Sequence, residues 1–248
     1  MNRRRLRFAG WGLAAGLLLL PAMAACGGDD DEPREATAPG ASPTAPGVPG
    51  TAVVESAMAQ KVNDALVPEA MADGKRLGKA EAALKIEAYE DFGCPHCLEF
   101  TAEIEPVIFQ EYVATGKASF EYKYFPLRQQ TGAAAIAAQC AAEQDKFWEY
   151  HRALFIAQAE ANAKTGPPLA EAFAAANLRK LAQDLGLDVP AWDTCVTGDS
   201  AVAVVQEELR QANTLALPGT PSFVINGKVT PAPDSVDGWR KLLDGLLK

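Results

Sequence analysis

Two cysteines three positions apart are the residues of this sequence best suited to chemistry. Cys94 and Cys97 enclose Pro95 and His96 in a C-x-x-C motif. A cysteine reacts as its thiolate, and a thiol in the first turn of a helix faces unpaired N–H groups that favour the anion. A three-residue step brings the second thiol beside the first on the next turn. The motif predicts a redox pair, with Cys94 as the outer nucleophile and Cys97 as the buried resolving thiol.

The two residues between the cysteines tune the stability of the thiolate. Pro95 removes one N–H group and stiffens the first helical turn, where proline is well tolerated. His96, if cationic or donating a hydrogen bond, would stabilise the thiolate further. A more stable thiolate makes a better leaving group and a more oxidising disulfide. Pro-His is the pair of oxidising proteins, so we expect a Cys94 pKa near the low end of the range of about 3.5 to 7 seen in such motifs.

A second segment downstream sharpens this interpretation. Thr220 and Pro221 immediately precede an apolar run that is typical of a strand. In a thioredoxin-like fold a proline at this place is cis and lies against the active cysteines. It offers no N–H to the sulfur, and it lets the preceding backbone pair with an extended substrate. We therefore expect Thr220 and Pro221 to form the substrate-binding loop.

The remaining cysteines are Cys26, Cys140 and Cys195. The chain therefore has five cysteines, an odd number that cannot all pair with one another. Lipidation of Cys26 would leave an even number, and two spare thiols outside the cytoplasm tend to pair. A Cys140–Cys195 disulfide would close a loop of roughly 55 residues and add about 3–4 kcal/mol on the loop-entropy model; the alternative is two buried free thiols. A zinc site needs four ligands, which usually come from two close pairs. This chain has one close cysteine pair, two cysteines far apart and only two histidines, so neither a metal nor a cofactor is expected.

The first 25 residues read as an export signal. Four arginines precede an uncharged stretch with a leucine-rich centre, and Met23-Ala24-Ala25-Cys26 resembles the lipobox of bacterial lipoproteins. A lipidated Cys26 would place the protein outside the cytoplasm, on the membrane facing the periplasm or on the outer face of the cell membrane. Cleavage to a soluble secreted protein and retention as an uncut anchor are the alternatives.

Residues 26–55 are rich in proline, alanine and glycine and resemble a disordered linker. Residues 56–248 are long enough for one domain with a sizeable core. Without residues 1–25, which contain four arginines, 19 Lys and Arg stand against 32 Asp and Glu, a net charge of −13. Such a charge argues against nucleic acid as a partner.

The order of elements predicts an α/β domain. Helical patterns dominate residues 129–216 and interrupt a simpler strand and helix alternation, so we expect an inserted helical subdomain there. A short helix, and a strand or a hairpin before Gly78, are expected within residues 52–80. The other predicted elements are strands at 83–89 and 119–125, a helix at 95–114 kinked at Pro106, helices at 129–144, 146–158, 168–185, 190–196 and 199–215, a hairpin at 221–230 turning at Asn226-Gly227, and a helix at 235–247.

The motifs resemble those of the DsbA family of thiol–disulfide interchange proteins, over about residues 75–248. The resemblance implies a thioredoxin fold with a helical insertion and the oxidation of thiols in exported proteins. It implies that Cys94 is the nucleophile, that Cys97 resolves, and that Thr220 and Pro221 face the substrate; the Cys140–Cys195 pair resembles the extra disulfide of some Gram-positive-type members. The matching segments are EDFGCPHC (90–97), YFPL (124–127), FWEYH (147–151) and TPSFVING (220–227).

One family feature is missing. Some members place a buried glutamate six residues before the first cysteine, where it helps to move the proton of the resolving thiol. Ala88 occupies that position here, and Glu87 and Glu90 are unassigned candidates for the role. His151, in an aromatic-rich helical stretch, is interpreted as a packed structural residue.

The leading functional prediction is an oxidase that introduces disulfides into reduced or misoxidised exported proteins and is reoxidised by a membrane redox partner. An extracytoplasmic reductase or isomerase, and a tethered peptide-binding chaperone module, are the alternatives. The redox potential separates the two enzymes, and a Cys94→Ser variant separates both from the chaperone.

Overall fold

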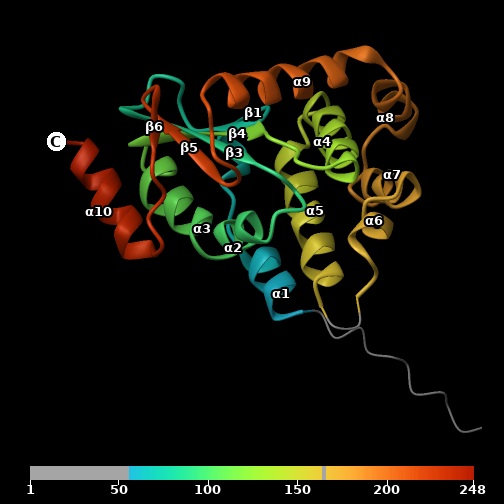
Figure 1. Ribbon diagram of the computed structural model, residues 1–248, viewed down its shortest axis with the longest axis horizontal. Coiled ribbons are helices and arrows are strands. Elements are labelled where there is room, and N and C mark those ends of the chain that lie inside the picture. Colours follow the sequence, from blue (N-terminus) through green and yellow to red (C-terminus); the bar gives the residue numbers. More distant parts are fainter. Residues whose placement is uncertain (1–55, 164–165) are drawn as a thin grey trace, which may run out of the picture. The chain divides into compact units, whose positions relative to one another are not determined.

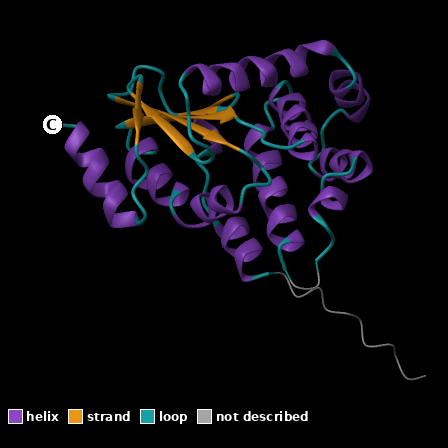
Figure 2. Ribbon diagram, viewed as in Figure 1, coloured by secondary structure: helices purple, strands orange, loops and turns teal. Residues whose placement is uncertain are grey.

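Two parallel strands, β3 (Leu84–Glu90) and β4 (Ala118–Tyr124), form the centre of the sheet. The computed structural model describes residues 56–163 and 166–248. The sheet has the order β1-β2-β4-β3-β5-β6, and all its other pairings are antiparallel. Figure 2 shows the sheet with helices on both faces. The remaining strands are β1 (Ala72–Asp73), β2 (Arg76–Leu77), β5 (Ser222–Ile225) and β6 (Lys228–Thr230).

The helices divide into two groups by their place in the chain (Figure 1). Those from α4 to α9 follow one another between β4 and β5, which confirms the predicted helical insertion. They are α4 (Gln129–Ala142), α5 (Phe147–Ala161), α6 (Leu169–Ala172), α7 (Ala175–Asp184), α8 (Val189–Val196) and α9 (Asp199–Thr214). The others are α1 (Ala57–Asp64), the 3₁₀ turn η1 (Glu69–Met71), α2 (Pro95–Glu103), α3 (Glu105–Ile108), the π turn η2 (Phe109–Val113) and α10 (Val236–Leu246).

Side-chain alternation decides which face of the sheet each residue of β3 reaches. Leu84, Ile86 and Ala88 lie in the main apolar core, whereas Tyr89 packs in a smaller cluster with residues of α9 and the loop after it. Glu90 therefore points to the same side as Ala88, the side of the main core. On β4 the buried residues Phe120, Tyr122 and Tyr124 alternate in the same way, as the sequence predicted.

A buried charge cluster attaches α9 to the opposite face of the sheet. The Glu208 carboxylate accepts hydrogen bonds from Lys75 Nζ at 2.6 Å and from the Tyr124 N–H at 2.8 Å. Lys123 Nζ lies 3.7 Å from the same carboxylate and 2.6 Å from Glu121. Removing one member of a buried ion pair leaves an uncompensated charge, so this cluster fixes how the insertion sits on the sheet.

The helix predicted at 95–114 is broken. α2 ends at Glu103, and α3 starts at Glu105 with Pro106 in its first turn. Proline has no N–H for the carbonyl four residues earlier, and its ring clashes there, so the regular helical pattern is interrupted at Ile104, whose backbone keeps right-handed helical angles (φ −105°, ψ −47°). The turn η2 then continues the helical path to Val113.

Three other sequence expectations meet the structure as follows. The single helix predicted at 168–185 is wrong, because the chain leaves helical geometry at Phe173 and Ala174. This turn buries the Phe173 ring in the core. The hairpin at Asn226-Gly227 is confirmed, and both residues adopt the positive φ angles, 51° and 76°, that such a tight turn requires. The short helix expected within 52–80 is present as α1, and of the two alternatives, a strand or a hairpin, the structure has the hairpin of β1 with β2.

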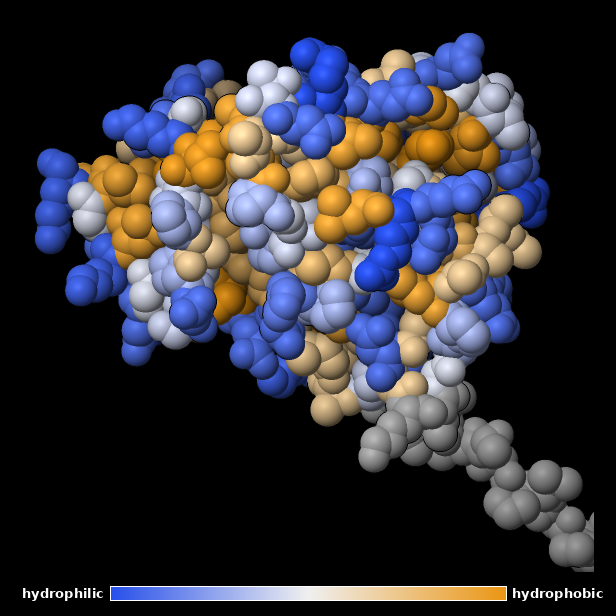
Figure 3. Space-filling model, in the orientation of Figure 1, coloured by the Kyte–Doolittle hydropathy of each residue, from blue (hydrophilic) through white to orange (hydrophobic). Residues whose placement is uncertain are grey.

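The predicted signal segment 1–25, the lipidation site Cys26 and the linker 26–55 lie outside the described residues. Within the ranges that the structure does describe, no helix has the length and apolar character to span a bilayer. Figure 3 shows hydrophilic side chains interspersed with apolar areas over the visible face.

Candidate active site

Cys94 caps the N-terminus of α2, and Cys97 lies inside its first turn. The Cys94 backbone is extended, and its N–H donates to the Asp91 carbonyl at 2.9 Å, which closes the turn that leads from β3 into the helix. Pro95 occupies the first helical position, where its missing N–H removes no helical hydrogen bond. Both thiols are free; Cys94 is half-buried, whereas Cys97 is 0% exposed.

The Asp91 side chain holds this turn in place. One carboxylate oxygen accepts the Gly93 N–H at 2.7 Å; the other accepts the Leu127 N–H at 2.7 Å and the Thr131 hydroxyl at 3.1 Å. Gly93 packs so closely on α4 that a Cβ there would lie 2.5 Å from Thr131 Cγ2. Asp91 thus links the cysteine turn to the start of the insertion, a role that sequence reasoning missed.

Antiparallel pairing of β5 with β3 brings Thr220 and Pro221 to the cysteines. Tyr89 pairs with Ser222, so the residues just before β5 lie beside the carboxyl end of β3. The Thr220–Pro221 peptide bond is cis. Cys94 Sγ donates to the Thr220 carbonyl at 3.2 Å. The cysteines and this loop, far apart in sequence, therefore form one site.

The environment separates the two thiols electrostatically. The Cys97 thiol, followed by the Thr220 side chain and the N–H groups of Cys97 and His96, lowers the pKa of Cys94 to about 5 against an opposing effect of burial. Burial, and next the neighbouring Cys94, raise the pKa of Cys97 well above its ordinary value. At neutral pH the reduced site therefore carries one thiolate, on the outer sulfur.

The His96 ring does not occupy the role that the sequence suggested. Its side chain is 77% exposed, and Nδ1 lies 3.3 Å from a Glu99 carboxylate oxygen, one helical turn along α2. The His96 backbone N–H, rather than the ring, contributes to lowering the pKa of Cys94. The Cys97 thiol, the Thr220 side chain and the backbone N–H groups of the first turn, rather than the imidazole, stabilise this thiolate.

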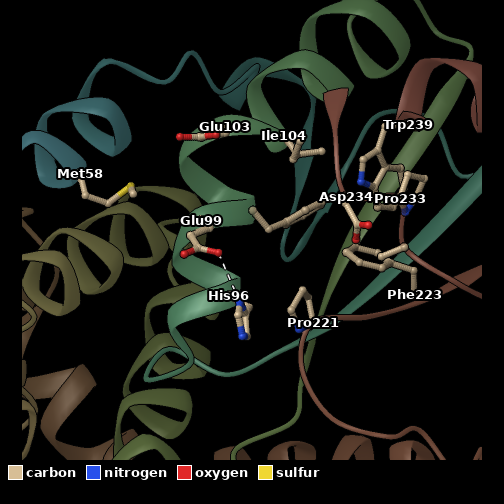
Figure 4. A pocket seen from close by; sticks show the side chains of 12 residues that line it. Met58, His96, Glu99, Glu103, Ile104, Pro221, Phe223, Pro233, Asp234 and Trp239 are labelled. Atoms are coloured by element: carbon tan, nitrogen blue, oxygen red, sulfur yellow. Dashed lines mark hydrogen bonds and ion pairs between the residues drawn. The ribbon is translucent and has the colours of Figure 1, made fainter. Parts of the chain in front are cut away.

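A groove of about 550 Å³ lies beside the site (Figure 4). His96 and Glu99 of α2 form one side, with Pro221 and the Phe223 ring of β5 opposite. Its remaining walls combine apolar and acidic residues, namely Met58, Phe100, Glu103, Ile104, Ala232, Pro233, Asp234 and Trp239. The groove offers room for an extended peptide next to the nucleophile.

Three further ionisable residues are buried behind Cys97. Glu90, Glu105 and His151 are 1–2% exposed. His151 packs among aromatic rings, including Phe92, Tyr122 and Phe155, in agreement with its interpretation as a packed residue. Glu105 escaped sequence reasoning because it resembles any helical glutamate; for Glu90, its alternation with Leu84, Ile86 and Ala88 was a usable signal.

Cys140 of α4 and Cys195 of α8 form a disulfide with an S–S distance of 2.05 Å. It lies within the insertion and joins two helices that also pack against each other. Across the part of the chain that the structure describes, no group of three or more His, Cys, Asp or Glu side chains is placed to hold a metal ion.

Comparison with known proteins agrees with this geometry. A family model described as thioredoxin matches residues 58–245. A Bacillus anthracis protein named "Probable disulfide bond formation protein D" is 26% identical over 175 residues, covering 69% of this chain and 77% of that protein. The Salinispora tropica "Na(+)/H(+) antiporter NhaA 3" is 26% identical over 163 residues, 64% of this chain. This chain spans only 22% of that antiporter's length.

Two solved structures share the fold. Oxidised BdbD from Bacillus subtilis superposes with a TM-score of 0.61 at 20% identity, covering 70% of this chain and 92% of that one. Wolbachia pipientis alpha-DsbA1 superposes with a TM-score of 0.59 at 22% identity, and the match covers 75% of this chain and 96% of that one. The thioredoxin-like fold with a helical insertion is therefore shared with DsbA-type proteins, as the motifs predicted.

Proposed function

This chain belongs to the thioredoxin family, and from that membership we propose that it is a protein thiol–disulfide oxidoreductase acting through Cys94 and Cys97. We further propose that it works as an oxidase, introducing disulfides into exported proteins. Reduced or misoxidised exported proteins would be its substrates, and a membrane redox partner would restore its disulfide.

One observation carries the proposal: the outer thiol has a lowered pKa, and the inner thiol has a raised one. A disulfide between such a pair is easily opened, because the thiolate left on Cys94 after release of the product is stable. The anion lies at the helix N-terminus next to the Thr220–Pro221 loop, where a substrate cysteine can approach.

The reaction proceeds by two exchanges. A substrate thiolate attacks Cys94 Sγ of the oxidised enzyme, and Cys97 leaves, which gives a mixed disulfide. A second substrate thiolate then attacks the substrate sulfur of that bond, and Cys94 departs as the thiolate. The substrate gains a disulfide, and the enzyme ends as the dithiol. Backbone pairing of the substrate with the Thr220 segment would position its cysteine for the first attack.

The reduction potential of the Cys94–Cys97 couple tests the oxidase assignment. The protein is equilibrated in glutathione buffers of known redox potential, and its free thiols are alkylated. Mass spectrometry of the fragment that contains the motif then gives the reduced fraction at each potential. A potential near −120 mV supports the oxidase, whereas one near −270 mV would assign the chain to the reductases. Oxidation of a reduced two-cysteine peptide should vanish in Cys94→Ser; folding assistance that survives in this variant would favour the chaperone alternative.

We also propose that the domain of residues 56–248 is exported and tethered to the membrane through lipid on Cys26, with residues 26–55 as the spacer after a cleaved signal of residues 1–25. The support is the sequence of these segments. Mass spectrometry of the protein recovered from cell membranes tests it: the chain should begin at Cys26 and carry a diacylglyceryl group there, and Cys26→Ala should lack both the lipid and the cleavage before residue 26. An unmodified Cys26 would refute the anchor.

A further inference from the structure

The three residues that precede Cys94 all contact the helical insertion or the loop that leads into it. Asp91, Phe92 and Gly93 form the turn between β3 and α2, and the first turn of α2 starts directly after them. All three residues are buried. The turn that carries the reactive thiol is therefore enclosed by a part of the chain that is remote from it in sequence.

The Asp91 carboxylate binds this turn to the start of α4. One oxygen accepts the Gly93 N–H at 2.7 Å, within the turn itself. The other oxygen accepts the N–H of Leu127, in the loop before α4, at 2.7 Å and lies 3.1 Å from the hydroxyl of Thr131, in the first turn of α4. The same hydroxyl lies 2.9 Å from the Arg128 carbonyl, so it has two acceptors within reach. One carboxylate thus joins the redox turn to the backbone and to a side chain of the adjoining segment.

Phe92 and Gly93 add packing contacts with the insertion. The centroid of the Phe92 ring lies 5.3 Å from that of Phe155 on α5. A Cβ at Gly93 would lie 2.5 Å from Thr131 Cγ2 and 3.0 Å from Leu169 Cδ2, so a larger residue fits only if the turn or its neighbours move. The Gly93 backbone does not adopt a positive φ angle. Glycine is therefore required at this position by the close approach of α4 and not by backbone conformation.

The Cys94 thiolate depends on donors from more than one element, so the place of the turn matters to it. The Cys97 thiol, followed by the Thr220 side chain and the N–H groups of Cys97 and His96, lowers the pKa of Cys94. The Cys94 N–H in turn donates to the Asp91 carbonyl at 2.9 Å. Hydrogen bonds weaken steeply when their distance and angle change. A displacement of the turn therefore changes the stability of the thiolate and, with it, the redox equilibrium of the pair.

Building on the proposed function, we propose that the helical insertion sets the redox equilibrium of the Cys94–Cys97 pair by fixing the turn before it, and that Thr131 is the positioning residue. The Thr131 methyl group limits how closely Gly93 can approach α4. The Thr131 hydroxyl holds the Asp91 carboxylate. Thr131 is a positioning residue because it acts on the cysteines through Gly93 and Asp91.

Gly93→Ala and its rescue test the packing contact. The new methyl group must push the turn away from α4, so the pKa of Cys94 should rise by about one unit, a part of one hydrogen bond to a charged group. This tenfold change corresponds to a potential about 30 mV more negative. Adding Thr131→Ser removes the methyl group that the new Cβ meets, while the end of the Leu169 side chain is free to move, so both values should return close to those of the wild type. Gly132→Ala is the matched control, because a Cβ there meets nothing within 4 Å.

Thr131→Val tests the hydrogen bond. Valine keeps a methyl group against Gly93 and removes the hydroxyl that holds Asp91, so the potential should again become about 30 mV more negative. Thr131→Ser alone keeps the hydroxyl and should stay near the wild type. Thr194→Val removes an exposed hydroxyl of α8 that bonds within its own helix, and it should leave the potential unchanged.

Urea unfolding of the oxidised and the reduced protein separates positioning from a general loss of stability. A contact that only supports the fold contributes equally to both forms, so its removal leaves the potential unchanged. A positioning role requires the reduced form to lose more stability than the oxidised form, by the amount that the change in potential gives. A wild-type potential in both Gly93→Ala and Thr131→Val would overturn the proposal, and so would a double variant with the potential of Gly93→Ala. If Gly93→Ala does not fold, the comparison of Thr131→Val with Thr131→Ser decides, because neither introduces a clash.

Failure of the oxidase assignment has a different signature. It is seen in the wild type, as a potential near −270 mV or as no oxidation of a reduced peptide. The role of Thr131 is measured from the differences between the variants and the wild type, so the two conclusions stand or fall separately.

Discussion

Replacing Cys97 with alanine tests the largest influence on the reactive thiol. The Cys97 thiol is the main group that lowers the pKa of Cys94 to about 5. Alanine removes this donor and keeps the position apolar. Serine keeps a hydroxyl that can donate to the same anion, so Cys97→Ala and Cys97→Ser form a matched pair of similar size.

The magnitude follows from the strength of one hydrogen bond to a charged group, about 1.5–3 kcal/mol. One pKa unit corresponds to about 1.4 kcal/mol, so the loss of this bond should raise the pKa of Cys94 by about one to two units. We therefore expect Cys97→Ala to titrate near pH 6–7 and Cys97→Ser to stay close to the reduced wild type.

The assay is the rise in thiolate absorbance at 240 nm as the reduced protein is titrated. Cys140 and Cys195 are disulfide-bonded and give no thiolate signal. In each variant Cys94 is then the sole titrating thiol of the domain, residues 56–248. Equal pKa values near 5 in both variants would refute the assigned role of Cys97, and a value near 8.5 for the serine variant would show that the site depends on sulfur at this position.

Three further changes probe other parts of the structure. Thr220→Val should raise the pKa of the reactive thiol by about one unit; the reduced form is then less stable, so a glutathione titration should give a potential about 30 mV more negative. Glu208→Gln should lower the free energy of unfolding in urea by about 3–5 kcal/mol, whereas Glu207→Gln, at an exposed position of the same helix, should leave it nearly unchanged; equal midpoints would contradict a stabilising ion pair. Replacing Cys140 and Cys195 together by alanine should cost about 3–4 kcal/mol in the same assay and leave the thiolate titration unchanged.

Local sequence patterns were sufficient to predict the order of helices and strands along the chain. Apolar alternation placed β3 and β4, and Asn226-Gly227 marked the hairpin, because each signal depends only on neighbouring residues. The break at Phe173 could not be predicted in this way, since the ring leaves the helix to reach a core built by other elements. The docking of α9 through Glu208 depends on partners from β4 and the loop before β2, which are remote in sequence.

The same distinction applies to the site. The C-x-x-C motif and the Thr220–Pro221 segment were readable because each has a fixed spacing or context. The orientation of the His96 ring could not be predicted from the motif. Glu99, three residues further along the helix, was an available hint, because it competes with the thiolate as a partner for the ring. Asp91 and Glu105 act through contacts made across the fold, and nothing in their neighbouring residues distinguishes them from ordinary surface acids.

The Cys140–Cys195 bond lies in the helical insertion, and its Cys140 end is wholly buried. Thiol–disulfide exchange requires a thiolate to reach a sulfur along the axis of the bond that it breaks. Helix packing around Cys140 denies that approach at the Cys140 sulfur, whereas Cys195 is only partly buried. The chain thus combines one crosslink that is closed to attack at its Cys140 end with one reactive pair, and an incoming thiolate can reach the first crosslink only through Cys195.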